Sequence, residues 1–298
     1  MSPLQNAEPT SGAPPGPVAI PAPTQSLSER FGLGGRVALV TGATRGLGRA
    51  ITLALAHAGA DLVVSSRKEG ACHDVAEEVR GLGRRALPHV CHVGRWDELD
   101  RLVEEAYEEF GRVDVLVNNA GIAPTYADPQ SVTEELWDKT LAVNLKGPFR
   151  LMALVGERMM AGDGGSIVNI TSIGGVRPTH DILPYAAAKA ALNALTLGFA
   201  DALGPKVRVN AVMPGPFHTD ISKHWDYEAF AERARTFPLR RAGEPEEVVG
   251  AVLYFASDAS SFTTGAVLAV DGGAQWSLAG GGDERGYGSI YDGTRDWT

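Results

Sequence analysis

The chain has 298 residues, 44% of them hydrophobic, which is enough for the core of a full domain. Its formal net charge of -9 disfavours nucleic acids and anionic membranes as partners, because both would repel an acidic protein. The two cysteines cannot make a disulfide framework, no apolar run reaches the roughly 18 residues of a membrane-spanning helix, and no signal peptide opens the chain, so the sequence predicts a cytoplasmic protein.

Proline and small residues dominate the beginning of the chain. A segment of this composition cannot bury enough apolar surface to order itself, which predicts a disordered tail over residues 1–32. Residues 278–298 are rich in glycine and predict a second loose tail, although their aromatic side chains could instead pack on a neighbouring subunit. Between the tails, strand and helix patterns alternate over residues 33–277 and predict one α/β domain with a doubly wound parallel sheet.

The first strand and helix of this domain are joined by a turn with three glycines. Val37–Val40 is apolar throughout, as expected of a strand buried on both faces, and a helix is predicted over Arg49–Ala58. A helix that begins at such a turn directs free N–H groups and its positive dipole end into the turn, which favours a phosphate there. A tight structural turn would give the same pattern. The candidate cofactor-binding residues of this turn are Gly42, Thr44, Arg45, Gly46, Leu47 and Gly48, of which the glycines would let the backbone approach a pyrophosphate.

The second predicted strand, Asp61–Ser66, bears on the choice of cofactor. In dinucleotide-binding folds an acidic residue near the end of this strand binds the 2′-hydroxyl of the adenosine ribose, and an arginine accommodates a 2′-phosphate. Ser66 and Arg67 stand at this position, and Arg45 lies in the glycine turn. Guanidinium groups make strong forked contacts with phosphate, so the sequence favours NADP over NAD. Alternatively, Arg67 is a solvated charge at a strand end.

Two helices, about 71–82 and 97–110, and a strand, about 86–91, precede another apolar strand that begins at Val113. This strand ends in Asn118-Asn119-Ala120-Gly121. Buried amides can tie neighbouring strands together, and small residues leave a close-packed floor under a ligand. Asn119, Ala120 and Gly121 are therefore candidate cofactor contacts, although an asparagine-rich turn would explain the same residues.

Thr41-Gly42-x-x-x-Gly46-x-Gly48 and Asn118-Asn119-Ala120-Gly121 resemble the motifs of the short-chain dehydrogenase/reductase family. The resemblance covers about residues 33 to 277. Further motifs follow in the family's order: Asn144 on a helix, Ser172 after the strand Ile167–Thr171, and the pair Tyr185-x-x-x-Lys189. The family implies a Rossmann-type sheet of about seven strands with helices on both faces, a dinucleotide across the carboxyl ends of the strands, and a homotetramer.

The resemblance also implies cofactor contacts that the residues alone do not indicate. It places Tyr185 and Lys189 against the cofactor as well as against the substrate. His92 stands where members of the family often have an aspartate near the adenine, so no adenine contact is assigned to it. The other implied contacts are Val93 and, in a turn that would receive the nicotinamide, Pro214, Gly215, Phe217 and Thr219.

Tyr185 and Lys189 are four residues apart and share one face of a predicted helix. A free tyrosine has a pKa of about 10, and the ammonium of Lys189 together with an oxidised nicotinamide would lower it by roughly two to three pH units. Tyr185 would then be the general acid in reduction and the base in oxidation. Ser172 can donate a hydrogen bond to the substrate oxygen. The resemblance adds Asn144, which would hold a water that links Lys189 to solvent.

The sequence therefore predicts an oxidoreductase that transfers a hydride between NADP(H) and the carbonyl or secondary alcohol of a small molecule. A 3-oxoacyl-carrier-protein reductase is the closest alternative, and the acidic character of the chain disfavours docking of an acidic carrier protein. An NADP(H)-sensing regulator without turnover would carry a damaged catalytic set, whereas this set is complete. No His, Cys or Asp cluster has metal-ligand spacing, so no metal is predicted. An amphipathic helix within Lys223–Phe237 would be either a lid or a plain surface helix.

Overall fold

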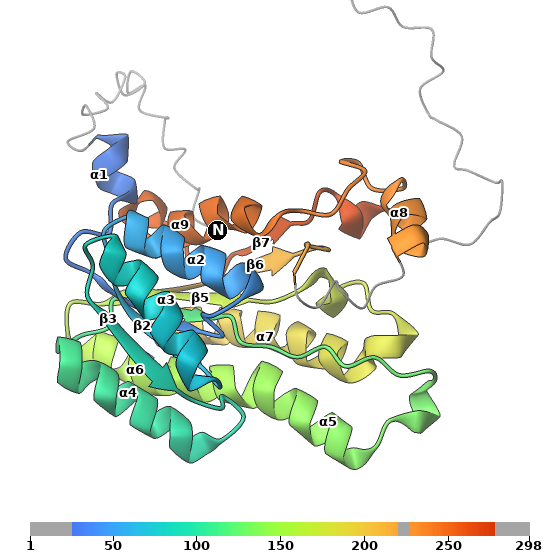
Figure 1. Cartoon of the computed structure of the whole chain (residues 1–298), viewed down its shortest axis with the longest axis horizontal. Coiled ribbons are helices and arrows are strands. Elements are labelled where there is room, and N and C mark those ends of the chain that lie inside the picture. Colours follow the sequence, from blue (N-terminus) through green and yellow to red (C-terminus); the bar gives the residue numbers. More distant parts are fainter. Residues whose placement is uncertain (1–25, 220–226, 278–298) are drawn as a thin grey trace, which may run out of the picture.

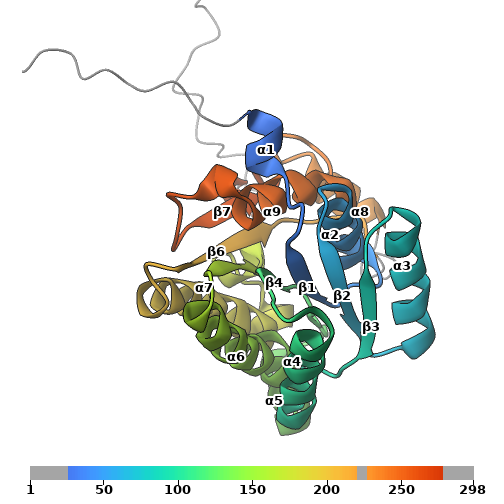
Figure 2. The same cartoon turned by 90° about the vertical axis from the view of Figure 1, so that its left-hand side faces the viewer.

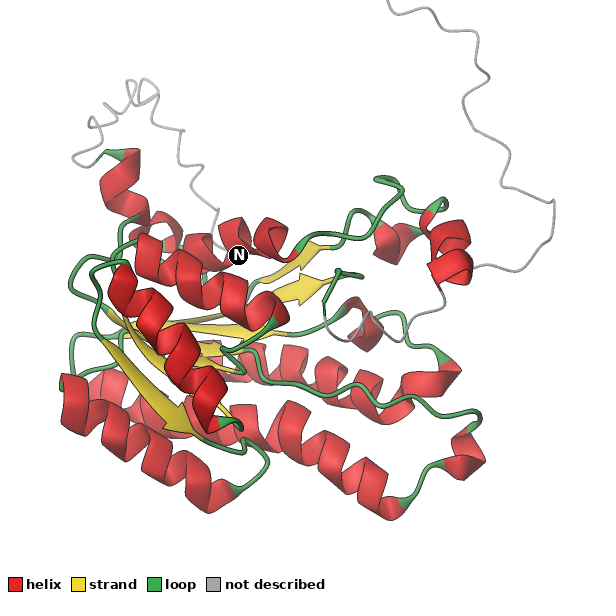
Figure 3. Ribbon diagram, viewed as in Figure 1, coloured by secondary structure: helices red, strands yellow, loops and turns green. Residues whose placement is uncertain are grey.

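The computed structural model describes residues 26–219 and 227–277, which form a sheet between two layers of helices (Figures 1 and 3). The sheet has seven strands in the order β3-β2-β1-β4-β5-β6-β7. Every neighbouring pair is parallel, which confirms the predicted doubly wound sheet. The strands are β1 (Val37–Thr41), β2 (Asp61–Ser66), β3 (Ala86–Val90), β4 (Val115–Asn118), β5 (Gly165–Ile170), β6 (Val207–Pro214) and β7 (Val267–Val270).

Nine α-helices are described, and those of the main layers cover both faces of the sheet (Figure 2). They are α1 (Leu27–Phe31), α2 (Gly46–His57), α3 (Glu69–Gly81), α4 (Trp96–Phe110), α5 (Glu134–Leu141), α6 (Gly147–Ala161), α7 (Leu183–Ala202), α8 (Tyr227–Ala234) and α9 (Val249–Ala256). All five residues of β1 are buried. Ala38 and Val40 belong to the core shared with α2, α3 and α9, whereas Val37 and Leu39 belong to the core shared with α4, α6 and α7. The uniformly apolar strand is explained by these two cores.

The described residues include a short helix, α1, inside the stretch that the composition predicted to be a tail. Its first turn is closed by a capping box, in which the Ser26 side chain accepts from the backbone of Glu29 and the Glu29 side chain accepts from the backbone of Ser26. The described fold therefore includes residues 26–32 of that stretch. Residues 1–25 and 278–298, the rest of both predicted tails, lie outside the described residues, as does the beginning of the predicted lid helix; α8 is its described part.

The longest described helix, α7, has 20 residues and carries the Tyr185 and Lys189 pair. By length and composition alone, His180–Ala202 would suit a membrane-spanning helix, whereas the sequence analysis found no such run. In the fold this helix packs against β6 and α5, and Lys189 and Leu192 are buried. It therefore belongs to the helical layer that covers the sheet.

Candidate active site

The glycine turn after β1 packs directly on the end of β4. The amide of Asn119 donates to the carbonyl oxygens of Thr41 (2.9 Å) and Gly42 (3.1 Å). A Cβ on Gly48 would overlap the Gly42 carbonyl and the Asn119 amide. Gly42 has a φ of 63°, and a Cβ there would lie 2.9 Å from the Cα of Ala120. The two predicted motifs thus form one close-packed floor in which these positions leave no room for side chains.

The N-terminus of α2 opens into the same region. Its N-cap, Arg45, gives the helix no side-chain cap, so the first N–H groups remain available to an anion. Thr44 Oγ1 donates to Ser66 Oγ at 3.0 Å and joins the turn to the end of β2. Arg45 and Arg67 are exposed, and no carboxylate among the described residues pairs with either guanidinium. Two uncompensated positive charges therefore lie at this end of the site.

Ser172, Tyr185 and Lys189 come together at the carboxyl end of β5. Ser172 follows this strand and accepts a hydrogen bond at its Oγ from the Gly174 N–H at 3.0 Å. Lys189 is only 4% exposed, and its Nζ donates to the Ile170 carbonyl at 2.8 Å. The same Nζ lies 5.7 Å from the centre of the Tyr185 ring. Strand β5 and helix α7 thus bring the hydroxyls and the ammonium to one place.

Burial shifts the pKa values of Tyr185 and Lys189. It raises the pKa of the Tyr185 hydroxyl, an effect that the hydrogen bond with Ser172 partly offsets. It also lowers the pKa of Lys189 to about 8. The sequence analysis expected Lys189 and an oxidised nicotinamide together to lower the pKa of Tyr185; in the protein alone, desolvation of the phenol outweighs the hydrogen bond with Ser172. Tyr185 is therefore a neutral hydroxyl, ready to donate a proton.

Asn144 lies in a π-helical turn, Ala142–Lys146, between α5 and α6. Its side chain is fully buried and binds the backbone of Ile122 on both sides: Oδ1 accepts from the Ile122 N–H (3.2 Å), and Nδ2 donates to the Ile122 carbonyl (2.8 Å). A Cβ on Gly121 would lie 2.9 Å from Asn144 Oδ1 and 3.7 Å from Lys189 Nζ. Asn144 and Lys189 thus both lie close to Gly121, and Asn144 holds the loop after β4. Short π-helical turns inside α-helices often occur at functional sites.

One cavity of about 300 Å³ joins these features. All the predicted cofactor contacts and Ser172 line this cavity. Asn144 is the one predicted catalytic residue that does not line it. The predicted residues in the lining are Gly42, Thr44, Arg45, Gly46, Leu47, Gly48, Ser66, Arg67, Val93, Asn119, Ala120, Gly121, Ser172, Tyr185, Lys189, Pro214, Gly215, Phe217 and Thr219.

Comparison with known proteins gives the family. The family profile described as enoyl-(acyl carrier protein) reductase matches residues 42–275. A human protein, dehydrogenase/reductase SDR family member 4, is 38% identical over 253 residues, which cover 84% of this chain and 91% of the relative. The chain belongs to the short-chain dehydrogenase/reductase family. It is therefore an NAD(P)(H)-dependent oxidoreductase acting on a small-molecule carbonyl or alcohol.

Solved structures of short-chain dehydrogenase/reductases agree in fold. A gluconate 5-dehydrogenase from Burkholderia cenocepacia in complex with NADP and tartrate is 34% identical, with a TM-score of 0.81 over 84% of this chain and 99% of the other. A 7α-hydroxysteroid dehydrogenase in complex with NADH and 7-oxo glycochenodeoxycholic acid is 33% identical, with a TM-score of 0.80 over 84% of this chain and 98% of the other. Proteins of this fold thus take either cofactor.

The lining of this short-chain dehydrogenase/reductase also contains residues that sequence reasoning missed. Most follow a strand that ends at the cavity, so their place beside a predicted motif was an available signal. Val143 is different, because only the π-helical turn brings it to the wall. His92, left without an adenine contact, lines the cavity and accepts at Nδ1 from the Gly94 N–H at 3.1 Å. The missed lining residues are Cys91, His92, Ile122, Val143, Ile170 and Thr171.

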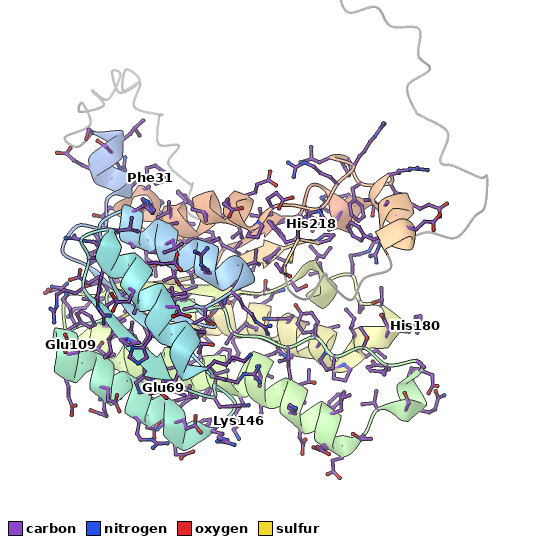
Figure 4. All side chains as sticks on the ribbon, viewed as in Figure 1. Phe31, Glu69, Glu109, Lys146, His180 and His218 are labelled. Atoms are coloured by element: carbon purple, nitrogen blue, oxygen red, sulfur yellow. The ribbon has the colours of Figure 1, made fainter. Side chains whose placement is uncertain are left out.

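Two histidines labelled in Figure 4, His180 and His218, lie close in sequence to elements that border the site. His180 precedes α7, and His218 follows β6 with its Nε2 4.0 Å from Glu244 Oε1. Neither lines the cavity. Within residues 26–219 and 227–277, no three His, Cys, Asp or Glu side chains are grouped so that they could hold a metal ion.

Proposed function

We propose that the protein transfers a hydride between NADP(H) and the carbonyl or secondary alcohol of a small molecule, with Tyr185 as general acid and base. One observation carries this proposal: Ser172, Tyr185 and Lys189 open into the cavity whose other end holds the glycine floor, Arg45 and Arg67, and neither arginine pairs with a carboxylate of the described residues. A phosphate-rich dinucleotide fits that floor, since side chains at Gly42 and Gly48 would have no room.

Different residues would bind the cofactor and carry out the proton transfer. The glycine turn and the open end of α2 would hold the pyrophosphate, and Arg45 and Arg67 would hold a 2′-phosphate. When bound, the nicotinamide supplies or accepts the hydride. In reduction, Ser172 Oγ donates to the carbonyl oxygen and orients it, and the Tyr185 hydroxyl gives it a proton. Lys189, behind the tyrosine, stabilises the phenolate left by this transfer, and Asn144 would connect Lys189 to solvent through a water.

Nicotinamide absorbance followed with a panel of ketones, sugars and acyl thioesters tests the proposal. Turnover of a ketone or sugar supports it. Turnover of the acyl thioesters alone would favour a 3-oxoacyl-carrier-protein reductase, the printed activity of a Thermotoga maritima relative that is 38% identical over 242 residues. Tight NADPH binding with no turnover on the whole panel would favour the regulator and contradict the proposal.

NADPH should bind more tightly than NADH, and Arg67→Ala should remove most of that difference. Charge-assisted hydrogen bonds to phosphate contribute about 1.5 to 3 kcal/mol, so we expect NADPH affinity to fall about 10- to 100-fold while NADH affinity stays within about twofold. Lys68→Ala is the matched control, because Lys68 is the exposed neighbouring cation outside the lining. Fluorescence titration measures both affinities; equal wild-type values would refute the NADP preference.

We also propose a homotetramer. An apolar groove of about 820 Å³ lies where α5, the π-helical turn and the beginning of α6 meet α7, lined partly by Leu141, Leu145, Phe149 and Ala194. Burial of such a surface favours association. Light scattering at micromolar concentration should give four times the chain mass. Ala194→Arg, a change at an exposed position, should lower that mass without unfolding the chain. A monomeric wild type would refute the assembly.

A further inference from the structure

The loop after β4 passes along the substrate end of the cavity, where Ile122 and Ala123 form part of the wall. Its beginning is fixed, because the Asn144 side chain binds both backbone groups of Ile122. Four residues later, the loop is attached a second time. The hydroxyl oxygen of Tyr126 accepts a hydrogen bond from the backbone N–H of Leu183 at 2.7 Å. The segment between Ile122 and Tyr126 is therefore a strap anchored at both ends.

The second anchor lies on the first turn of α7. The N-cap of this helix, Ile182, provides no side-chain cap, and Pro184 has no N–H to satisfy. Within the described part of the chain, the Tyr126 hydroxyl is the one side-chain group that accepts a hydrogen bond from a backbone N–H in the first turn of α7. Tyr185 follows Leu183 by two residues in the same turn. A group that holds Leu183 therefore also holds the backbone that carries the Tyr185 hydroxyl.

We propose that Tyr126 is a positioning residue, which fixes the first turn of α7 against the strap so that Tyr185 meets the substrate oxygen held by Ser172. This inference rests on the proposed carbonyl chemistry. Tyr126 does not line the cavity, so it acts through the strap and through α7. A small displacement of a reacting group is costly in catalysis. Loss of this one anchor should lower the rate by about 5- to 30-fold, as expected for one hydrogen bond at a helix terminus.

Tyr126→Phe tests the inference, because it keeps the ring and removes only the acceptor. With a carbonyl substrate from the panel, we expect kcat to fall about 5- to 30-fold while the Kd for NADPH, measured by titration, stays within about twofold. Tyr254→Phe is the matched control. Its hydroxyl makes one hydrogen bond of similar length, 2.8 Å to Thr263 Oγ1, at α9, away from the cavity. A kcat for Tyr126→Phe within twofold of the wild type, or an equal loss in Tyr254→Phe, would overturn the proposal.

Amide hydrogen exchange gives a readout that needs no substrate. In Tyr126→Phe the Leu183 amide should exchange faster than in the wild type, because its acceptor is gone, and in Tyr254→Phe it should not. If the wild type turns over no carbonyl, the proposed function fails, and exchange still decides whether Tyr126 holds α7. Unchanged exchange at Leu183 would overturn the positioning role whether or not the enzyme is active.

Discussion

Tyr185→Phe should lower turnover by at least about 10²-fold to 10⁴-fold while the affinity for NADPH stays nearly unchanged. The loss is that of a positioned proton donor, because the change removes only the hydroxyl that faces Ser172. The ring still lines the cavity beside Lys189, whose Nζ lies 5.7 Å from its centre. Steady-state kinetics and a separate NADPH titration distinguish lost chemistry from lost binding.

The pH profile tests the same assignment. Because burial raises the pKa of Tyr185, the hydroxyl keeps its proton over the ordinary range, and carbonyl reduction should not decline through ionisation of Tyr185 below about pH 10. Alcohol oxidation needs the deprotonated oxygen and should become faster as the pH rises. The limb that reports Tyr185 should be missing in Tyr185→Phe. Wild-type turnover in that variant would mean that the proton takes another route.

Lys189→Met should abolish most activity and at the same time stabilise the fold near pH 7. Burial lowers the pKa of Lys189 from 10.5 to about 8, so the folded protein disfavours the charged form by up to about 3 kcal/mol. Methionine removes this penalty and also the hydrogen bond to Ile170, which contributes about 1 kcal/mol. A net gain of about 1 to 2 kcal/mol should raise Tm by roughly 2 to 8 °C.

The sign of this effect depends on pH. Below about pH 8 both the folded and the unfolded lysine are protonated, and the cost of the buried charge is fully present. Between about pH 8 and 10.5 only the unfolded lysine keeps its proton, so the stability of the wild type rises with pH and the advantage of methionine disappears. Lys206→Met is the control, because exposed Lys206 donates to the carbonyls of Met160 and Gly162. A Lys189→Met protein less stable than the wild type at about pH 7 would contradict the argument.

Local chemistry explains what the sequence could predict. The glycines at 42 and 48 and the amide of Asn119 are needed for one close contact, so residue type and place after a strand were sufficient to find them. The pKa of Tyr185 could not be predicted, since its direction depends on how much water the surrounding elements exclude. The place of Val143 in the cavity wall could not be predicted for a related reason. The five-residue π-helical turn that carries it has no clear sequence pattern, yet it decides which side chains face the cavity.

Contacts between segments that are distant in the sequence could not be predicted either. Tyr126 and Leu183 are 57 positions apart, and neither residue has a type that marks it as half of a pair. Helix α1, in contrast, had a signal in the sequence. Ser26 and Glu29 have the spacing of a capping box, but the proline-rich composition before them obscured it. Composition describes a segment on average, whereas a helix terminus depends on two residues.

The strand order has an evolutionary consequence. Residues that would select the coenzyme, Arg45, Ser66 and Arg67, follow β1 and β2, whereas the predicted catalytic hydroxyls of Ser172 and Tyr185 come after β5 in the other half of the sheet. The two groups share no hydrogen bond among the described residues. Substitutions at separated, unconnected sites combine nearly additively. A lineage carrying this fold could therefore exchange one coenzyme pool for the other while its substrate repertoire stays intact, and could acquire new substrates without altering its redox supply.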